Sequence, residues 1–329
     1  MSLNRILYIT KGEHSASTRY RATDFFEDWR NAGWVPSHIT HDGSLRTWFE
    51  IFKQAKQSDV VVVVRRIFNS PFRQCLRRCA KRLVYDYDDA IFVRGSGEKS
   101  ASKWKRYARN MSNYDLIWAG NPYLAEKASA FNSCVEVVPT AIEPERYDLT
   151  PEKSGTYFDL VWIGSRSTRK HLITVLPALE AAAVQIPRLR LKVIADFELD
   201  SEQLKIVNIP WSPEVETLEL TNAHVGIAPL PENAFNRGKC GLKILQYMAS
   251  RLPVICTPTG VNADLVVPGE TGFHACSPEE WVSSIQRLAA DLEMGGRMGV
   301  LGQQRCTMAY TRQAVFEKRL QSLKALVEG

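Results

Sequence analysis

Residues 235–262 read FNRGKCGLKILQYMASRLPVICTPTGVN, and this stretch decides the fold. Residues 242–250 have the apolar spacing of a helix, and residues 253–256 form a short apolar run typical of a buried strand. Glycines and cations lie at the start of the helix, where free backbone N–H groups and the helix dipole favour an anion. They are Arg237, Gly238, Lys239 and Gly241. The stretch therefore predicts one unit of an α/β protein with a phosphate site, and a solvated helix start is the alternative.

The polar side chains of this stretch also have helical spacing. Lys239, Lys243 and Gln246 are separated by four and three residues, so we expect them to line one helix face and point at the same ligand. Leu242 and Leu245 would fill the opposite face, toward the core.

Outward from this stretch, short apolar runs alternate with segments of helical spacing along the chain. Strands are expected at 6–10, 60–64, 83–85, 116–119, 135–138, 160–163, 191–195, 225–228 and 253–256. Helices are expected at 18–31, 45–56, 71–81, 103–112, 122–131, 171–184, 214–220 and 242–250. This alternation predicts parallel sheets with helices on both faces, and such open sheets bind ligands beyond the carboxyl ends of their strands.

The length and the turn-rich residues divide the chain. At 329 residues it is long enough for about two domains. Pro144, Pro151 and Gly155 mark a polar linker at 144–156. We therefore expect two doubly wound halves, with the ligand site in the cleft between them.

Charge and cysteine content narrow the class of protein. Residues 65–109 hold 13 basic and 4 acidic side chains, while residues 151–329 hold 19 of each. Seven cysteines without a Cys-x-x-Cys pair favour reduced thiols over zinc or disulfides. Without an apolar run of membrane length or an export signal, a cytoplasmic protein is expected. No nucleic-acid motif accompanies the basic residues, so nucleic acid is not an expected partner.

Taken with motifs elsewhere, the stretch resembles glycosyltransferase family 4, glycosyl transferases group 1, in a bacterial branch. The motifs, in chain order, are STRYR at 17–21, VYDYDDAIF at 84–92, AGNPYLA at 119–125, VPTAIE at 138–143, WIGS at 162–165, GL at 241–242, YMA at 247–249, LPVI at 252–255 and GETGF at 269–273. The resemblance implies the GT-B fold, with two Rossmann-like domains.

On this resemblance the domains are residues 1–150 on the acceptor side, residues 151–310 for the nucleotide sugar, and a C-terminal helix at 311–329 that packs back on the first domain. The implied reaction is retaining, metal-independent transfer of a sugar from a nucleotide-diphosphate sugar to a glycan or lipid-linked acceptor in cell-envelope polysaccharide synthesis. No cofactor is implied.

This chain departs from the family in one motif. The family carries a Glu-x7-Glu pair whose positions fall here on Gly238 and Gln246, so neither carboxylate is present. The resemblance implies that the second position holds the donor ribose, and the amide of Gln246 can still hydrogen-bond a hydroxyl. Gly238 cannot replace a carboxylate, which leaves the sugar specificity open.

The resemblance assigns further donor residues. A basic turn follows the strand at 160–163, and its cations would grip the donor phosphates, where charge develops in the transition state. Its residues are Gly164, Ser165, Arg166, Arg169 and Lys170. The expected catalytic residues are Lys239, Lys243 and Arg166. The remaining donor-binding residues are Arg237, Gly238, Gly241, Leu242, Gln246, Gly260 and Asn262.

Polar residues at strand ends of the first half are the acceptor-side candidates. They are Arg19, Arg21, Asp88, Asp89, Asn121 and Thr140. The aspartates would suit a metal in isolation, but they equally suit acceptor hydroxyls or a helix cap, and no metal site is predicted. Helix starts and turn capping are the competing interpretations for the others.

The basic segment 65–109 suggests one more partner. Arg73, Arg77 and Arg78 are interleaved with Phe68, Phe72, Leu76 and Leu83, which would fit docking on an anionic inner membrane face. A solvated helix face is the alternative. For the whole chain, two other functions stay open, namely a nucleotide-sugar epimerase of the same fold and a non-catalytic nucleotide-sugar-binding subunit.

Overall fold

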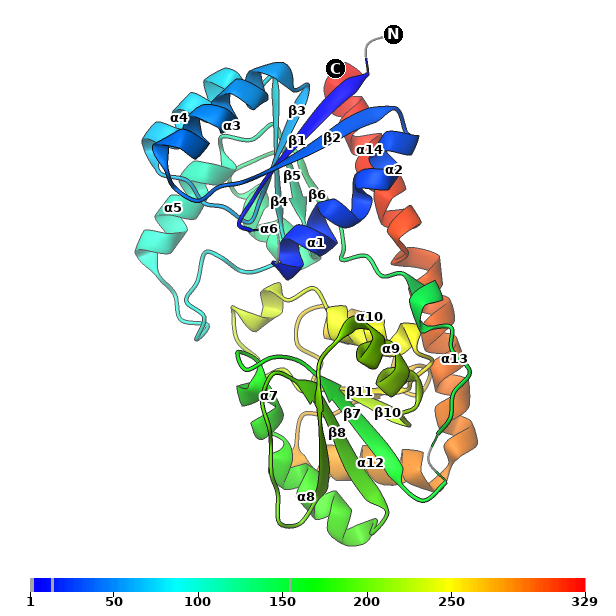
Figure 1. Ribbon diagram of the computed structural model, residues 1–329. Coiled ribbons are helices and arrows are strands. Elements are labelled where there is room, and N and C mark those ends of the chain that lie inside the picture. Colours follow the sequence, from blue (N-terminus) through cyan, green and yellow to red (C-terminus); the bar gives the residue numbers. More distant parts are fainter. Residues whose placement is uncertain (1–2, 13–14, 154, 329) are drawn as a thin grey trace. The chain divides into compact units, whose positions relative to one another are not determined.

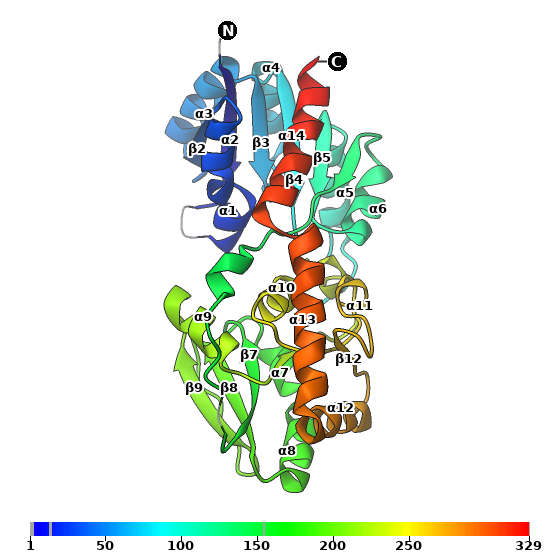
Figure 2. The ribbon, with the colours of Figure 1, turned by 90° about the vertical axis from the view of Figure 1, so that its right-hand side faces the viewer.

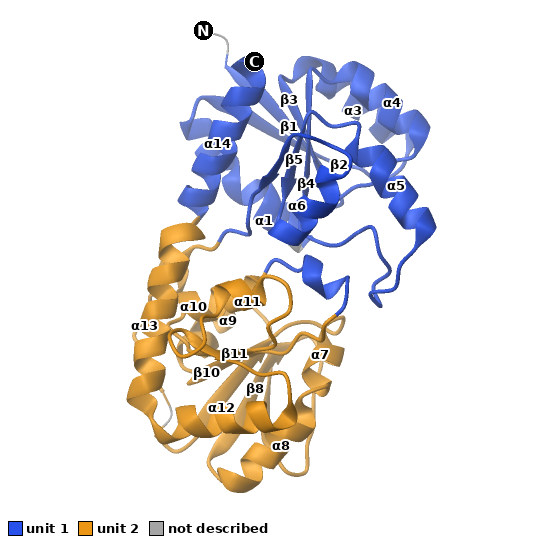
Figure 3. Ribbon diagram, turned by 180° about the vertical axis from the view of Figure 1, so that it is seen from behind, with its two compact units in different colours: residues 1–141, 233–240, 312–329 blue, residues 142–232, 241–311 orange. Residues whose placement is uncertain are grey.

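The protein is described by a computed structural model that covers residues 3–12, 15–153 and 155–328. It divides into two compact units (Figure 3). Unit 1 comprises residues Met1–Ala141, Asn233–Cys240 and Arg312–Gly329, and unit 2 comprises Ile142–Glu232 and Gly241–Thr311. Residues 235–240 of the stretch 235–262 therefore belong to unit 1, and residues 241–262 belong to unit 2.

Unit 1 is built on a parallel six-stranded sheet in the order β2-β1-β3-β4-β5-β6. The strands are β1 (Asn4–Thr10), β2 (Trp34–Thr40), β3 (Val60–Val64), β4 (Arg82–Tyr87), β5 (Leu116–Ala119) and β6 (Val135–Val137). The five valines of β3 are buried on both faces: Val61 and Val63 join one core and Val60, Val62 and Val64 the other. Successive strand residues point to opposite faces, so a continuous valine run suits a central strand.

Helices cover both faces of this sheet (Figure 1). They are α1 (Ala16–Arg21), η1 (Thr23–Phe25), α2 (Phe26–Asn31), α3 (Leu45–Gln57), α4 (Ser70–Cys79), α5 (Ala101–Met111), α6 (Pro122–Ser129), η3 (Asn236–Gly238) and α14 (Arg312–Glu328). Buried residues of α3, α4, α5 and α6 pack with Val61 and Val63. Those of α2 and α14 pack with Val60, Val62 and Val64.

The C-terminal helix packs back on the first unit, as expected. Trp118 Nε1 donates to Ser322 Oγ of α14 over 2.8 Å, and Arg82 Nε donates to the Leu326 carbonyl, also over 2.8 Å. Figure 2 shows α14 along β4 and β5.

Unit 2 repeats the architecture, with the parallel order β12-β11-β10-β7-β8-β9. Its strands are β7 (Phe158–Ile163), β8 (Leu189–Ala195), β9 (Lys205–Pro210), β10 (Val225–Ala228), β11 (Val254–Cys256) and β12 (Gly272–His274). Its helices are η2 (Pro144–Tyr147), α7 (Arg169–Ile173), α8 (Leu176–Gln185), α9 (Pro213–Thr221), α10 (Leu242–Ala249), α11 (Asn262–Leu265), α12 (Pro278–Ala290) and α13 (Leu292–Ala309). The two α/β sheets confirm the expected fold class.

Three strands that the sequence did not predict lie at the edges of the sheets. β2 and β9 are edge strands whose side chains are mostly half-buried, and β12 is a three-residue edge strand. Edge strands lack the continuous apolar run of a central strand, and β2 even contains Pro36, which an edge tolerates.

Helix α13 was also missed, because its four glycines lower helix propensity. One of them is required by packing. A Cβ on Gly299 would lie 2.0 Å from the Arg251 carbonyl oxygen, so α13 can approach the turn after α10 only with glycine there.

Candidate functional site

In unit 2, two residues expected to bind the donor meet at the carboxyl end of β7. The Lys243 ammonium lies 3.9 Å from the ring centroid of Trp162, the buried penultimate residue of that strand. A Cβ on Gly164 would lie 2.8 Å from Lys243 Nζ and 2.2 Å from the Trp162 ring. Glycine at 164 thus makes room for the lysine, and the indole holds the ammonium by a cation–π contact. This cation stands where open α/β sheets bind their ligands.

The turn after Gly164 is ordered by its own hydrogen bonds. The Ser165 N–H donates to Thr168 Oγ1 over 3.0 Å, and the Arg166 N–H donates to Asp196 Oδ1 over 2.6 Å. Arg166 and Arg169 both line a cavity of about 710 Å³ at the ends of β8 and β9. The Arg169 guanidinium lies 5.6 Å from the Phe197 ring centroid, and Lys170 is exposed. The turn therefore presents cations while its backbone is fixed.

Gln246 has a partner that the sequence did not indicate. Its side-chain nitrogen donates to Glu216 Oε1 over 2.8 Å, and the two residues are 4% and 2% exposed. Glu216 also accepts from Tyr147 Oη and Trp211 Nε1, each over 2.7 Å. A carboxylate from α9 thus stands beside the position where the family has its second glutamate. No local signal could have found Glu216, because the pairing depends on how α9 and α10 pack.

Two candidate donor residues, Gly260 and Asn262, stabilise the turn after β11. Asn262 is 4% exposed, and its side-chain nitrogen donates to the Thr257 carbonyl over 3.2 Å. Gly260 has a φ of +55°, a left-handed conformation that favours glycine. Asn262 therefore orders this turn.

The start of helix α10 differs from the prediction that Lys239, Lys243 and Gln246 share one helix face. Helix α10 begins at Leu242 after Gly241, whose φ is +70°, and Lys239 follows the separate short helix η3. Lys239 therefore does not share a helix face with Lys243 and Gln246, and that prediction was wrong. The left-handed glycine turns the chain between the two helices.

In unit 1, Asn121 anchors the segment that carries Arg237 and Lys239. Its side-chain oxygen accepts from the Leu124 N–H over 2.8 Å and so caps α6. Its side-chain nitrogen donates to the carbonyls of Arg237 and Lys239, over 3.2 and 2.9 Å. Asn121 is 1% exposed, so it acts here as a buried clamp.

Lys239 joins a cluster of charges at the carboxyl end of β4. Its ammonium donates to Asp89 Oδ1 over 2.8 Å, and Asp89 also pairs with Arg65, which the sequence did not single out. Arg65 Nε lies 3.1 Å from Asp88 Oδ1. Burial raises the pKa of Asp88, Arg65 lowers it, and the neighbouring Asp89 raises it further.

Arg65 adopts a φ of +55°, which is uncommon for a residue with a side chain. Strain of this kind costs on the order of 1–3 kcal/mol and persists where the surroundings hold it. Among the described residues no group of three or more His, Cys, Asp or Glu side chains is arranged to hold a metal ion.

The structure gives a reason for glycine at 238. A Cβ there would lie 2.6 Å from both the Cβ and the backbone nitrogen of Ala90. The segment 233–240 packs directly against the loop after β4, so the carboxylate that the family carries at this position has no room here.

Arg21 is a structural residue in this unit. It is fully buried, pairs with Asp86 and donates from Nη1 to the carbonyls of Val138 and Pro139, over 2.9 and 3.0 Å. Arg319 of α14 reaches the same carboxylate, with Nη2 3.1 Å from Asp86 Oδ2. The expectation that Arg21 faces an acceptor does not fit this burial, because its donors are used inside the unit.

The remaining acceptor-side candidates differ in exposure. Arg19 is half-buried and lies 4.4 Å from the Tyr20 ring centroid, whereas Thr140 is only 4% exposed.

The apolar membrane anchors expected in segment 65–109 are not available. Phe68, Phe72, Leu76 and Leu83 are at most 5% exposed and belong to the core under α4 and α5. Their helical spacing reflected packing on the sheet. Within the described residues, no helix has both the length and the apolar character needed to cross a membrane.

The comparisons with known proteins agree with this architecture. Residues 158–291 match the family described as "Glycosyl transferases group 1". No curated protein matches the chain in sequence.

Solved structures resemble it along its whole length. Sucrose-phosphate synthase from Thermosynechococcus elongatus is 14% identical, with a TM-score of 0.72 and coverage of 98% of this chain and 99% of that one. HepE of Anabaena, in complex with UDP and glucose, is 13% identical, with a TM-score of 0.72 and coverage of 98% and 100%. A glycosyltransferase from Rickettsia africae is 12% identical, with a TM-score of 0.70 and full coverage of both chains.

The family match spans β7 to α12 and lies in unit 2 except for residues 233–240; it holds Gly164, Trp162 and Lys243. The likeness to solved structures shows the GT-B fold for the whole chain. Residues 158–291 are therefore similar to the glycosyl transferases group 1 family, and the fold of the chain is GT-B.

Proposed function

We propose that this glycosyltransferase moves a sugar from a nucleoside diphosphate sugar, with UDP-sugars as the first candidates, to an acceptor of cell-envelope polysaccharide synthesis. The observation that carries the proposal is the Lys243 ammonium held on Trp162 beside Gly164. It lies inside the segment that matches the family. HepE in complex with UDP and glucose, and a pneumococcal O-GlcNAc transferase in complex with UDP and GlcNAc, support UDP as the carrier.

Lys243 would stabilise the leaving group. When the bond to the anomeric carbon breaks, negative charge develops on the departing diphosphate. A cation fixed beforehand stabilises that charge without reorganising, and so lowers the barrier more than it tightens substrate binding. Arg166 and Arg169 would add charge from the neighbouring turn. The reaction would be retaining and would use no metal ion.

Gln246 would hold the donor ribose through its side-chain oxygen, which can accept from a ribose hydroxyl. Glu216 would fix the orientation of this amide, since it accepts from the Gln246 side-chain nitrogen. Lys239, Asp88 and Asp89 would face the acceptor from unit 1, and the transfer would take place in the cytoplasm at the inner membrane face.

Calorimetry of donor binding tests the role of Lys243. Lys243→Ala should weaken UDP-glucose binding by at least about tenfold, the equivalent of 1.4 kcal/mol. Lys205→Ala is the matched control, because Lys205 also lies on an aromatic ring, 4.2 Å from the Tyr157 centroid, but on the edge strand β9. If both variants bind the donor as the wild type does, Lys243 is not a donor residue.

A further inference from the structure

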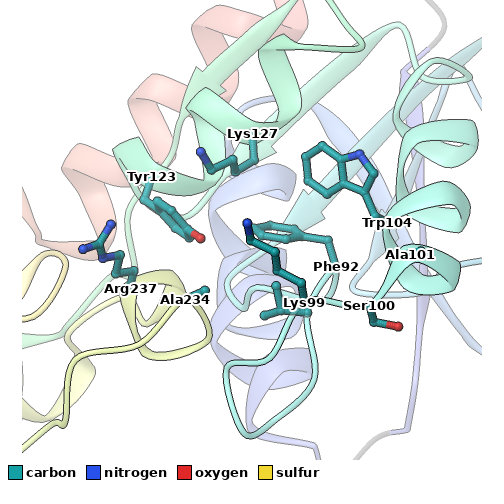
Figure 4. Close-up of a pocket in the computed structure, with 10 residues that line it drawn as sticks. Phe92, Lys99, Ser100, Ala101, Trp104, Tyr123, Lys127, Ala234 and Arg237 are labelled. Atoms are coloured by element: carbon teal, nitrogen blue, oxygen red, sulfur yellow. The ribbon is translucent and has the colours of Figure 1, made fainter.

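A pocket in unit 1 has Arg237 as the one residue of its lining that the sequence assigned to the donor. It has a volume of about 540 Å³, within the range of small-molecule sites, and its walls are almost entirely apolar. Figure 4 shows that its side chains come from the loop after β4, from α5, from α6 and from the 233–240 segment. All of these belong to unit 1.

The apolar walls are aromatic and rigid. Phe92, Trp104 and Tyr123 line the pocket, with Phe92 5.6 Å from Trp104 and 6.0 Å from Tyr123 between ring centroids. Trp104 is 38% exposed, so part of its ring is accessible from solvent. The loop that forms one wall is fixed, since Lys103 Nζ donates to the Val93 carbonyl over 2.9 Å and Val93 bridges to Lys99.

Among the described residues, three cations and no carboxylate line this pocket. They are Lys99, Lys127 and Arg237 (Figure 4). Lys127 has one carboxylate near it, the exposed Glu126 at 2.7 Å, and an exposed pair of this kind holds a charge only weakly. The pocket thus combines a hydrocarbon surface with a positive charge.

The sequence left two acceptor classes, a glycan and a lipid-linked acceptor, and the apolar walls and cations of this pocket favour the lipid. A glycan presents hydroxyl groups along its length, and burying them against apolar walls leaves them without hydrogen bonds. A hydrocarbon chain loses nothing there and is driven in by the release of water. The cations then require an anionic group close to the chain.

We propose that this pocket binds the hydrocarbon chain of a lipid phosphate acceptor and that Lys99, Lys127 and Arg237 hold its phosphate. The inference rests on the proposed function, since it names the acceptor class of that reaction. It places the acceptor lipid in unit 1, whereas the proposed donor residues Lys243, Arg166 and Gln246 lie in unit 2.

Octyl phosphate, used below its aggregation concentration in titration calorimetry, is the direct probe. Octyl glucoside tests the chain without the anion, and inorganic phosphate tests the anion without the chain. We expect saturable binding of octyl phosphate at one site, at least about tenfold tighter than either partial probe. Equal affinity for octyl glucoside and octyl phosphate would overturn the assignment of the cations.

Two kinds of variant test whether octyl phosphate binds in this pocket. Ala101→Trp fills the pocket from the exposed first turn of α5, and the double variant Lys99→Glu, Lys127→Glu reverses charge at its rim. Each should weaken octyl phosphate binding by about tenfold or more. Lys105→Glu, an exposed lysine on α5 that does not line the pocket, is the control and should bind as the wild type does. Unchanged affinity in both pocket variants contradicts the proposal.

UDP binding, measured on the same samples, separates this inference from the proposed function. We expect it to stay unchanged in all these variants, which also shows that they fold. If the wild type binds UDP but not octyl phosphate, the lipid pocket is wrong and the transferase proposal stands. If it binds octyl phosphate but not UDP, the proposed donor is wrong. Should Ala101→Trp fail to fold, the charge-reversal variant decides alone.

Discussion

Lys243 rests on the ring of Trp162, and Gly164 leaves the space that the lysine occupies. Because Lys243 is on α10 and Trp162 is the penultimate residue of β7, one contact links the start of helix α10 to the first strand of unit 2. The sheet buries the indole completely, so the ammonium is held against a fixed surface. This relationship underlies the donor proposal.

Gly164→Ala should therefore damage donor binding through Lys243. The new methyl group would meet both the ring and the ammonium, so one of them must move. We expect a loss of UDP-glucose affinity of about tenfold and a destabilisation of about 1–3 kcal/mol, measured by calorimetry and urea unfolding. Gly296→Ala, on α13 with open space around it, should leave affinity unchanged and stabilise the helix by up to about 1 kcal/mol. Equal donor affinity in both variants would show that Gly164 does not position the lysine.

Restoring the missing family carboxylate at 238 should fail. In Gly238→Glu the Cβ would collide with the backbone of Ala90, so unit 1 should lose about 1–3 kcal/mol of stability, and transfer activity should not rise. Gly95→Glu, in the same unit with nothing within 4 Å of an added Cβ, controls for the added charge. A stable and more active Gly238→Glu variant would refute the packing argument.

The buried charges of unit 1 predict an order of destabilisation. Asp86 is enclosed by Arg21 and Arg319, and all three side chains are fully buried. Asp86→Asn leaves two buried guanidinium groups without a counter-charge and should cost about 3–5 kcal/mol or more. Arg319→Met removes the excess positive charge and should cost less. Urea unfolding measures both, and a reversed order would contradict this account of the cluster.

His224 should make unit 2 sensitive to acid. Burial lowers its pKa to about 4, with Lys153 as the next cause, and its Nδ1 accepts the Asp159 N–H over 3.1 Å. The folded state favours the neutral ring, so its stabilising contribution is complete above the ordinary pKa of 6.5. It falls as the pH drops from 6.5 toward 4.

The replacement His224→Asn tests this dependence, because the asparagine oxygen can accept the same N–H without titrating. The stability difference between wild type and variant, from urea unfolding at pH 7.5 and pH 5, should shift in favour of the variant at the lower pH. A difference that does not change with pH would show that His224 does not titrate as described.

The sequence predicted the central strands because each is buried on both faces and reads as an apolar run, as the valines of β3 do. It missed β2 and β9 because edge strands carry half-buried and polar residues. It placed Lys239 on the helix of Lys243, since spacing alone does not show that a left-handed glycine at 241 separates them.

Site residues could be predicted where they belong to a local sequence motif. They could not be predicted where their role depends on a contact between residues far apart in the sequence. Gly164 and Lys243 were both candidates, but their meeting on Trp162 joins residues far apart in sequence. Glu216 and Arg65 carried no signal, because one is paired by helix packing and the other depends on a strained backbone at the end of β3. Arg21 looked like a surface cation at a helix, and only the position of Asp86 shows that it is buried.

We expect the chain to transfer sugar from a nucleotide donor, with Lys243 at the leaving group. The direct measurement incubates the full chain with radiolabelled UDP-sugars and bacterial membrane extract, and follows both free UDP and label in the acceptor fraction. We expect equal amounts of the two products, with the rate falling by about a hundredfold or more in Lys243→Ala and little in Lys205→Ala. An intact or epimerised donor without labelled acceptor, or an undiminished rate in Lys243→Ala, would contradict it.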